Sequence, residues 1–421
     1  MSILIFEDSA VPRLNPVTTA RPACCVNMGS FSLLELLKQL AEPLTLSVRS
    51  YLQNIVQQDN PDISVFGPTH DSTQNPPKLI LNSRVIPSAG NLATIRGLLQ
   101  TANQTDAPKI VWTDDQVAAI LNPGWTWEEI RQKTSSGFEQ LLLAAHDFSK
   151  LECTLSIVSH PHEVIAANMS VIRENLELRI ASEAYSQKQD GVFMAESASI
   201  GDYVITDTSD GPIIIDEDAS VGPYTLLRGP IYVGPRCRIL EHAAIKDEVS
   251  LGHTTKIGGE VEAAVVEPFT NKQHHGFLGH SYLGSWINLG AGTCNSDLKN
   301  TYGTVNMEYA SGKCATGMQF LGCVMGDYSK TAINTGIFTG KVIGVCSMMY
   351  GFVTSNVPSY VNYARLFGQM ATLPSEVMIA TQQRMFSRRK VTQRPSDMQL
   401  IHDMYRVTQP ERDKFSDEMA F

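Results

Sequence analysis

In the second half of the chain, aliphatic side chains recur at every sixth position. The longest uninterrupted run holds eight of them, and a glycine directly follows four of the eight. This spacing matches neither the α-helical turn of about 3.6 residues nor the simple alternation of a β-strand. It fits a parallel solenoid of triangular section, in which each flat side takes six residues and the aliphatic side chain points into the prism. The eight positions are Ile215, Val221, Leu227, Val233, Ile239, Ile245, Leu251 and Ile257.

The same register continues on both sides of this run. It appears earlier at Met194 and Ile200, and it returns from Leu283 onward and over residues 325–349. We therefore predict a solenoid over residues 191–360. Glycine is expected at its corners because the chain turns sharply there, in places at positive φ.

Two stretches, residues 259–279 and 295–320, interrupt the six-residue spacing. Insertions leave a solenoid as loops, and loops held by a rigid scaffold often carry function. The polar segments NKQHHGFLGHSYLG (271–284) and NLGAGTCNSDLKNTYG (288–303) lie in and beside these stretches. We expect the functional residues of the solenoid to come from them.

The first part of the chain alternates between strand-like and helix-like segments. This order predicts an α/β domain over residues 1–185 that ends in a linker helix. The stretch 59–78 is rich in Pro, Asn and Asp and is predicted to be a loop. After the solenoid, residues 361–421 are polar and are predicted to form a helical C-terminal tail. Strands are predicted at residues 3–6 and 78–87, and helices at 31–40, 114–121, 127–147 and 162–186.

Composition and charge exclude several classes of protein. Of the 421 residues, 43 are acidic and 33 basic, and the net charge is −10. Without a strong positive field, we predict no nucleic-acid partner. No apolar run approaches the roughly 20 residues that span a bilayer, and the start of the chain lacks the pattern of a signal peptide, so we predict no membrane association. Eight cysteines without a CxxC pair are typical of the cytoplasm, the predicted location.

The order of these parts resembles one family closely. It is similar to the bifunctional N-acetylglucosamine-1-phosphate uridyltransferase/glucosamine-1-phosphate acetyltransferases, and most of all to a divergent group of sugar nucleotidyltransferases with a shortened first domain. The resemblance implies a Rossmann-like nucleotidyltransferase domain, a left-handed parallel β-helix of hexapeptide repeats and a homotrimer. It also implies a transferase of sugar-nucleotide biosynthesis, of the kind that supplies UDP-N-acetylglucosamine, which moves an acetyl group from acetyl-CoA to an amino-sugar phosphate.

The segment GHSYLGSWINLGAGTCNSDLKN (279–300) carries this resemblance in the solenoid. It is similar to the family segment that holds a histidine, a Tyr–Leu–Gly and an Asn–x–Gly–Ala–Gly–Thr. The resemblance implies that His280 is the general base for the sugar amine, a role that suits a neutral imidazole. Tyr282 and Asn288 would hold the sugar and its phosphate. The spacing from His280 to Tyr282 is one residue shorter than in the family.

Four further residues belong to the site that the resemblance implies. Asn295 falls where the family contacts the sugar phosphate, and Lys299 falls where it contacts acetyl-CoA. Arg228 and Lys272 would supply positive charge to the sugar phosphate.

In the first domain, RLNPVTTARP (13–22) resembles the nucleotidyltransferase pattern R–x–x–P–x–T–x–x–x–P. The Gly-rich loop that cradles a triphosphate in those enzymes is replaced by FEDSAVP (6–12), and the family lysine by Ala23. The resemblance implies nucleotidyl transfer from UTP or dTTP to a sugar 1-phosphate, with Mg²⁺ on Asn168 of HEVIAAN (162–168). The nucleotide-binding candidates are Arg13, Arg21, Asn82 and Arg84, of which the last two lie in LNSRVIP (81–87).

Two alternative functions stay open at this point. Hexapeptide solenoids also resemble γ-class carbonic anhydrases, in which three histidines hold Zn²⁺ across a subunit boundary and lower the pKa of bound water. His275 and His280 have the spacing of two of those ligands, and His242 or His253 would be the third. The other alternative is a non-catalytic binding or assembly module, in which the solenoid only trimerises the chain.

The tail carries a basic cluster, Arg384, Arg388, Arg389 and Lys390. Such a cluster is either a solvated helix face or a site that holds the phosphates of a long cofactor. The sequence leaves both readings open.

Overall fold

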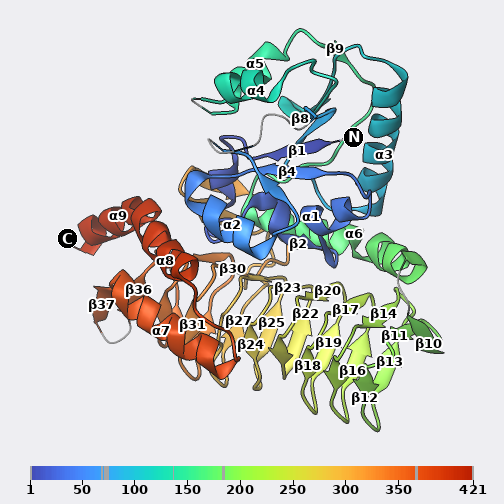
Figure 1. Ribbon diagram of the computed structural model, residues 1–421. Coiled ribbons are helices and arrows are strands. Elements are labelled where there is room, and N and C mark those ends of the chain that lie inside the picture. Colours follow the sequence, from blue (N-terminus) through green and yellow to red (C-terminus); the bar gives the residue numbers. More distant parts are fainter. Residues whose placement is uncertain are drawn as a thin grey trace. The chain divides into compact units, whose positions relative to one another are not determined.

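The computed structural model describes residues 2–67, 70, 75–135, 137–182, 185–365 and 368–419 (Figure 1). The chain divides into two compact units. An α/β unit comprises Met1–Leu14, Arg21–Val26 and Phe31–Ser159, and a β-helix unit comprises Asn15–Ala20, Asn27–Ser30 and His160–Phe421. The predicted linker helix is α6 (Pro161–Ser182), which is grouped with the β-helix; residues 183–184 of the prediction lie outside the described residues.

The α/β unit is built around a seven-stranded sheet in the order β5-β4-β1-β6-β8-β7-β9. Strands β5, β4, β1 and β6 pair in parallel, whereas β8 runs antiparallel to both of its neighbours. The predicted strand at residues 3–6 is the central, fully buried β1. The strands are β1 (Ile3–Phe6), β4 (Leu44–Ser47), β5 (Ser64–Val65), β6 (Leu79–Asn82), β7 (Lys109–Thr113), β8 (Gln116–Leu121) and β9 (Ser149–Lys150).

Five α-helices belong to the described part of this unit. The predicted helix at residues 31–40 is confirmed, and the Ser32 hydroxyl accepts the Glu35 N–H at 3.2 Å as its N-cap. Two short helices, α4 and α5, replace the single helix predicted at residues 127–147. The helices are α1 (Leu33–Lys38), α2 (Gln53–Asp59), α3 (Ala89–Gln104), α4 (Trp127–Lys133) and α5 (Glu139–Ala144).

The helix predicted at residues 114–121 is wrong. The segment is strand β8, whose residues 117–121 are buried and paired with β6 on one side and β7 on the other. A short apolar run has no periodicity that separates a buried strand from a buried helix. Asp114, at φ 51°, lies in the turn that joins β7 to β8. The loop predicted at 59–78 contains the short strand β5, and its residues 68–69 and 71–74 lie outside the described residues.

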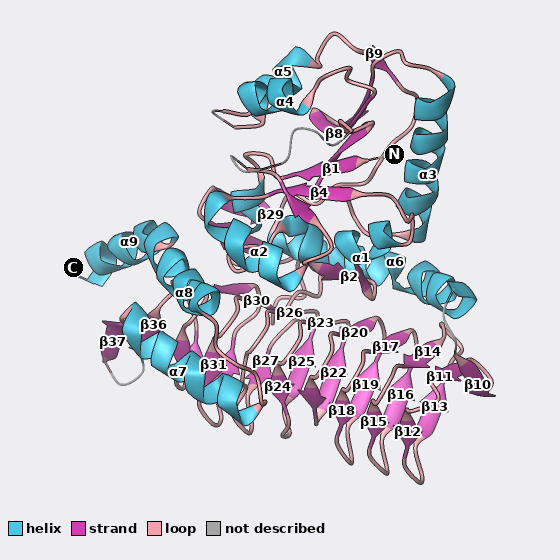
Figure 2. Cartoon of the chain, viewed as in Figure 1, coloured by secondary structure: helices cyan, strands magenta, loops and turns pink. Residues whose placement is uncertain are grey.

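The second unit winds as a parallel β-helix, which confirms the predicted solenoid (Figure 2). Along its three sides, each strand except the antiparallel end strands β10 and β37 pairs in parallel with a strand of a neighbouring coil. The left-handed sense of the coil stays a prediction.

The strands of the β-helix fall into three sets, one for each side. The first is β10 (Ser186–Gln189), β11 (Val192–Met194), β14 (Ile213–Ile215), β17 (Ile231–Val233), β20 (Val249–Leu251), β23 (Val265–Val266), β26 (Tyr282–Leu283), β30 (Cys323–Met325) and β33 (Lys341–Ile343). The second is β12 (Ser199–Ile200), β15 (Ser220–Val221), β18 (Arg238–Ile239), β21 (Lys256–Ile257), β24 (Asn271–Lys272), β31 (Lys330–Thr331), β34 (Met348–Met349), β36 (Val361–Ala364) and β37 (Gln369–Thr372). The third is β13 (Ile205–Asp207), β16 (Leu226–Arg228), β19 (Ala244–Lys246), β22 (Glu260–Glu262), β25 (Phe277–Gly279), β27 (Cys294–Asn295), β32 (Gly336–Ile337) and β35 (Phe352–Val353). The remaining strands are β2 (Asn27–Met28), β3 (Phe31–Ser32), β28 (Asn306–Tyr309) and β29 (Gly312–Ala315).

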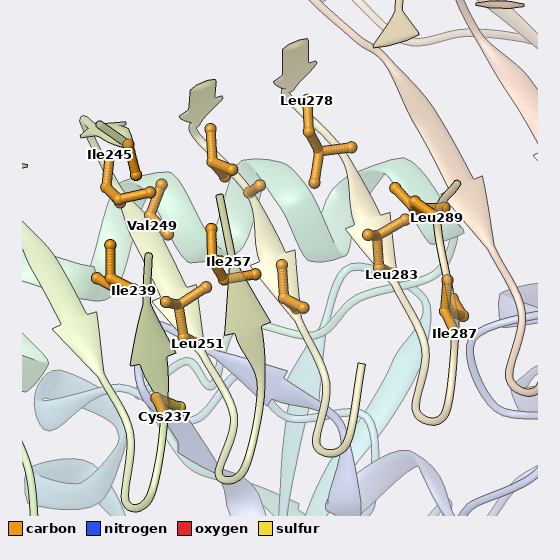
Figure 3. Close-up of a cluster of buried hydrophobic side chains, with 14 of the residues drawn as sticks. Cys237, Ile239, Ile245, Val249, Leu251, Ile257, Leu278, Leu283, Ile287 and Leu289 are labelled. Carbon is orange, nitrogen blue, oxygen red and sulfur yellow. The ribbon is translucent and has the colours of Figure 1, made fainter. Parts of the chain in front are cut away.

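The aliphatic residues of the six-residue repeat point into the coil, as predicted. Ile215, Val233 and Leu251 pair in register and are fully buried. Figure 3 shows such side chains, among them Ile239 and Leu251, stacked along the interior. Because each one contacts its counterparts in the neighbouring coils, the interior is one continuous apolar core. Ile200 in the first coil is the exception, with 38% of its surface exposed.

The glycines after these positions permit close approach of the coils, not positive φ, which corrects the expectation from the sequence. A Cβ atom on Gly258 would lie 2.1 Å from the Gln273 carbonyl oxygen of the next coil. Positive φ falls instead on non-glycine corner residues such as Tyr224, at φ 57°. Backbone contact between coils therefore selects glycine at these corners.

Residues 259–279 are regular coil and not a loop, which corrects a second expectation. Val266 pairs in register with Leu251, fifteen residues earlier, whereas Val233 and Leu251 lie eighteen apart. The shorter coil breaks the six-residue spacing of the sequence but keeps the spatial register. The second interruption is a true insertion that contains the β28–β29 hairpin.

The tail is helical from Ser375 onward and packs on the coils, whereas residues 361–364 and 369–372 of the predicted helical tail form strands β36 and β37. Its helices are α7 (Ser375–Arg388), α8 (Pro395–Val407) and α9 (Gln409–Met419). The Phe386 ring stacks on Trp286 with 4.4 Å between centroids, and the Tyr360 hydroxyl donates to the Ile401 carbonyl at 2.6 Å. In the described part of the chain, no helix has both the length and the apolar character that a membrane span requires.

Gly258→Ala tests the close approach of the coils. Its Cβ would lie 2.1 Å from a backbone oxygen, so we expect it to lower the free energy of unfolding by about 1–3 kcal/mol. Gly303→Ala is the matched control, because the nearest atom to its Cβ is the Thr301 hydroxyl at 3.9 Å. Urea unfolding followed by circular dichroism measures both, and equal effects would contradict this account of the corner glycines.

Candidate active site

The outward residues of the third side form one column. Asp207, Arg228, Lys246, Glu262 and Gly279 pair with one another on successive coils. This column and the adjacent corner enclose a pocket of about 450 Å³. The structure thus brings two predicted site residues, His280 and Arg228, together. The lining residues are Asp207, Asp210, Arg228, Asp247, Glu248, Glu262, Ala263 and His280.

His280 is held by a carboxylate and an aromatic ring. Its Nδ1 lies 2.9 Å from Asp297 Oδ2, and its ring stacks on Phe320 with 5.3 Å between centroids. Only 8% of the residue is exposed. Because a carboxylate only accepts hydrogen bonds, the contact places the proton of the neutral imidazole on Nδ1 and leaves a lone pair on Nε2. An imidazole in this state serves as a general base at Nε2.

Asn295 positions the turn that carries His280. Its amide accepts the Gly279 N–H at 2.9 Å and donates to the Gly279 carbonyl at 3.0 Å. Asn295 pairs in register with Ile337, so it occupies an inward position and is buried. We therefore place Asn295 behind the pocket, as a residue that fixes the His280 backbone.

Ion pairs order the charged side chains around the pocket. Arg228 forms a bidentate pair with Asp247, with Nε 2.7 Å from Oδ1, and this hydrogen bond raises the pKa of Arg228 above its usual value. Lys246 lies between Glu260, at 2.6 Å, and Glu262, at 3.0 Å. Burial, and next the charge of Asp247, raise the pKa of Glu248. The lining therefore holds five carboxyl groups and one guanidinium group, and it favours a cationic group such as an ammonium.

The structure places Lys272 and Tyr282 away from this pocket. Lys272 pairs in register with Ile257, so its side chain enters the coil, where Nζ donates to the Gly258 carbonyl at 2.7 Å. Burial lowers the pKa of Lys272 to about 8. Tyr282 is fully buried, and its hydroxyl donates to Glu267 at 3.1 Å.

Asn288 and Lys299 are accessible but do not line the pocket. Asn288 is exposed on the second side, beside Asn271 and Lys330. The Lys299 Nζ donates to the Thr304 carbonyl at 3.1 Å, within the insertion.

In the α/β unit, Asn82 and Arg84 meet at the carboxyl ends of β1 and β6. The Asp8 carboxylate receives Arg84 Nη2 at 2.6 Å, Arg84 Nε at 3.0 Å and Asn82 Nδ2 at 2.9 Å. Both predicted residues are almost fully buried. Ligands of open α/β sheets bind at this edge. Here the charge of Arg84 is already balanced by Asp8, a residue that the sequence analysis missed.

Arg13 and Arg21 do not join this cluster. Arg13 is exposed, and the Arg21 carbonyl accepts a bond from Arg49 Nη2 at 2.9 Å. In the segment that replaces the family's Gly-rich loop, Glu7 receives the Arg49 Nε at 3.0 Å and the Ala23 N–H at 3.0 Å. The residues that replace the loop therefore present a carboxylate to their own chain.

Asn168 does not fit a magnesium ligand in this structure. Its Oδ1 accepts both the Gly29 N–H at 2.8 Å and the Ser250 hydroxyl at 2.7 Å, and its Nδ2 donates to the Glu248 carbonyl at 2.6 Å. Both lone pairs of Oδ1 are used, and the residue is fully buried. Mg²⁺ prefers carboxylates and waters around it, and within the described ranges no three His, Cys, Asp or Glu side chains could hold a metal ion together.

The histidines of the zinc alternative have other partners. His242 stacks on Tyr224 with 5.5 Å between centroids, and His253 meets the edge of Phe269 at 5.0 Å. Burial, and next the charge of Arg236, lower the pKa of His253 to about 4.

Asp297, Phe320 and Glu262 also belong to the site, although no motif in the sequence points to them. Asp297 lies seventeen residues after His280, and Phe320 lies at the far end of the insertion. Only the pairing of coils of unequal length brings these residues to His280 and to the pocket. If the repeat in the sequence had been traced with some coils shorter than the others, it would have predicted that Glu262 lies beside Gly279.

Comparisons with known proteins agree with this division of the chain. The sequence model of the sugar nucleotidyl transferase family matches residues 3–183. The Bifunctional protein GlmU of Nitrosospira multiformis is 26% identical over 208 residues, 48% of this chain and 43% of that protein. The bifunctional sugar-1-phosphate nucleotidylyltransferase/acetyltransferase of Sulfurisphaera tokodaii is 29% identical over 142 residues, 33% of this chain and 35% of that protein.

Solved structures with weaker likeness are acyltransferases. The UDP-N-acetylglucosamine acyltransferase of Francisella novicida is 16% identical, with 55% of this chain and 83% of that chain covered, at a TM-score of 0.34. The acetyltransferase domain of PglB from Neisseria gonorrhoeae is 10% identical, with 58% and 91% covered, at a TM-score of 0.20. Likeness at these scores supports no conclusion on its own.

The chain thus joins a segment that matches the sugar nucleotidyl transferase family, residues 3–183, to a parallel β-helix. The chain is similar to GlmU proteins over parts of its length. It spans less than half the length of the two curated relatives named above.

Lys272→Met tests the inward place of Lys272. We expect the KM for an acceptor to change less than about twofold, because the side chain lies outside the pocket. The folded pKa of about 8 is below the unfolded value of about 10.4, so the wild type gains stability as the pH rises between these values. The methionine variant lacks this gain. Unfolding midpoints at pH 7.5 and 9.5 measure the difference, and a tenfold rise in KM would restore the role predicted from the sequence.

Proposed function

We propose that the chain is a transferase of sugar-nucleotide biosynthesis whose β-helix moves the acetyl group of acetyl-CoA to the amine of an amino sugar. The observation that carries the proposal is the Asp297–His280 pair, with Nδ1 and Oδ2 2.9 Å apart at a pocket lined by carboxyl groups. The family of the chain supports it, because its curated relatives are named as acetyltransferases or bifunctional proteins.

The residues perform the chemistry in a defined order. The amine nitrogen attacks the thioester carbonyl, a C–N bond forms, and the C–S bond breaks to release the CoA thiolate. His280 Nε2 takes the proton that leaves the amine and later returns it to the thiolate. Asp297 keeps the proton on Nδ1 and stabilises the imidazolium that forms.

The carboxyl groups that line the pocket influence which acceptor substrate binds there. They favour the ammonium end of the substrate, and Arg228 is the single cation among the lining residues. The resemblance implies an acceptor that carries a phosphate. Binding of that phosphate in this pocket would depend on Arg228, which is already paired with Asp247. Whether the acceptor is a phosphorylated amino sugar is tested by comparing glucosamine 1-phosphate with glucosamine.

His280→Ala tests the general base. We expect kcat/KM for acetyl transfer to fall by about 10²–10⁴-fold, because proton transfer from the amine is lost. His274→Ala is the control, since His274 is exposed and lies outside the pocket. Release of the CoA thiol, followed with a thiol reagent, measures both variants. Acetyl transfer that survives in His280→Ala would remove the assigned base.

Asp297→Asn tests the orientation of the base. The asparagine can present its NH₂ group to Nδ1 and so favour the wrong tautomer, and we expect kcat to fall by at least about tenfold while the KM for acetyl-CoA stays within about twofold. A variant with unchanged kcat would show that the contact with Asp297 does not serve the reaction.

Nucleotidyl transfer in the α/β unit is the second proposed activity, favoured by the family match over residues 3–183. Pyrophosphate release from UTP or dTTP in the presence of sugar 1-phosphates tests it. We expect release by the wild type and a higher KM for the nucleotide in Arg13→Ala, which removes an exposed guanidinium group. No release with any pair of substrates would contradict the activity.

We also propose that the chain acts as a cytoplasmic homotrimer. The side chains of Ile333, Phe338 and Phe352 are 69%, 50% and 53% exposed near the last coils, and burial between subunits would remove them from water. All eight cysteines are free thiols, as is usual in a reducing compartment. Sedimentation should give three times the mass of the 46.2 kDa chain; a monomer would contradict this part of the proposal.

A further inference from the structure

The second side of the β-helix displays a column of polar residues that the proposed activities leave without a role. In each of its first five strands one residue points inward and the other outward, and the outward residues pair on successive coils. The bridges Asn271↔Asn288↔Lys330 continue the column toward the tail. None of its members is acidic. They are Ser199, Ser220, Arg238, Lys256, Asn271 and Asn288, followed by Lys330.

Two cations lie next to each other in this column. Arg238 and Lys256 are Cα partners on neighbouring strands, which places their backbones about 4.8 Å apart. Like charges at directly opposite positions of a sheet are destabilising. Their exposed or half-exposed side chains therefore hold repulsive charge on the surface of the coil.

The tail adds two further cations at the same place. The Arg389 Nη2 donates to Asn271 Oδ1, in the strand that follows Lys256. This bond brings the end of α7, with Arg388 and Arg389, to the column. Burial, and next the charges of Arg389, Arg238 and Arg388, lower the pKa of Lys256. Two members of the basic cluster seen in the sequence thus face two cations of the coils.

No carboxylate balances this group. In the described part of the chain, Arg238, Lys256, Arg388 and Arg389 form no ion pair with Asp or Glu. The third side shows the contrast, because Lys246 there lies between two glutamates. In a chain of net charge −10, four adjacent cations without a counter-charge require an anion from outside to relieve their repulsion.

We propose that Arg238, Lys256, Arg388 and Arg389 bind the phosphate groups of an organic phosphate. Guanidinium groups match phosphate oxygens in a bidentate geometry, and a lysine adds a point charge. The hydroxyl of Ser220, next to Arg238 in the column, and the amide of Asn271 supply neutral donors on either side. The site is separate from His280, so it stands whether or not the proposed acetyl transfer does.

Calorimetric titration of the full chain with ATP, pyrophosphate, CoA and dephospho-CoA tests this site. We expect binding of at least one of these by the wild type and a loss of affinity of at least about tenfold in the double variant Arg238→Gln/Lys256→Gln. Arg236→Gln is the matched control, since it removes one exposed charge at a corner of the same coil, outside the column. His280→Ala should bind as the wild type does.

Stability in phosphate-free buffer gives a second readout. Removing repulsive charge should leave the unfolding midpoint of the double variant equal to or above that of the wild type, and added ATP or CoA should raise the midpoint of the wild type only.

Tighter binding of CoA than of dephospho-CoA would assign the site to a phosphate monoester, and equal binding of the two with tight ATP binding would assign it to a polyphosphate. No binding to the wild type, or an equal loss in Arg236→Gln, would overturn the proposal.

Discussion

Inward packing of alternate side chains along each strand of the β-helix is the constraint on which the rest of the unit depends. Each inward position must fill the same apolar interior, so every other position of the same strand is turned outward. The rule holds whatever the residue type. Lys272 and Asn295 occupy inward positions and are buried, and their polar groups are satisfied by backbone atoms of neighbouring coils. Arg228 and Arg238 occupy outward positions, where Arg228 pairs with Asp247 and Arg238 is exposed.

The candidate site follows from this register together with one insertion. The third side displays charged residues of both signs, and the corner after β25 turns His280 toward them. Asp297 lies near the start of the insertion and Phe320 at its end, and both contact the imidazole. The insertion therefore completes the surroundings of a histidine that the coil itself positions. A stiff scaffold of this kind holds a base and its carboxylate in fixed geometry, which is what proton transfer requires.

The sequence predicted the β-helix because its interior is a strict hydrophobic repeat, which is a local signal. It also led to His280 and Arg228, which line one pocket. Prediction from the sequence failed where the position of a residue depends on the length of its coil. One coil is three residues shorter than the coil before it, so regular structure looked like a loop and the inward position of Lys272 was not recognised. The prediction also failed at β8, because a short apolar run does not distinguish a strand from a helix. Asp8 and Asp297 were missed because their partners lie far away in the sequence.

The central claim is that Asp297 holds the His280 proton on Nδ1 and leaves Nε2 as the base. Nitrogen NMR of protein with ¹⁵N-labelled histidine reports the tautomer directly, and the His280 signal is identified by its absence from a variant without this histidine. At a pH where the ring is neutral, the account predicts a protonated Nδ1 and an unprotonated Nε2. A proton on Nε2 would contradict it, because the nitrogen assigned as the base could then accept no proton.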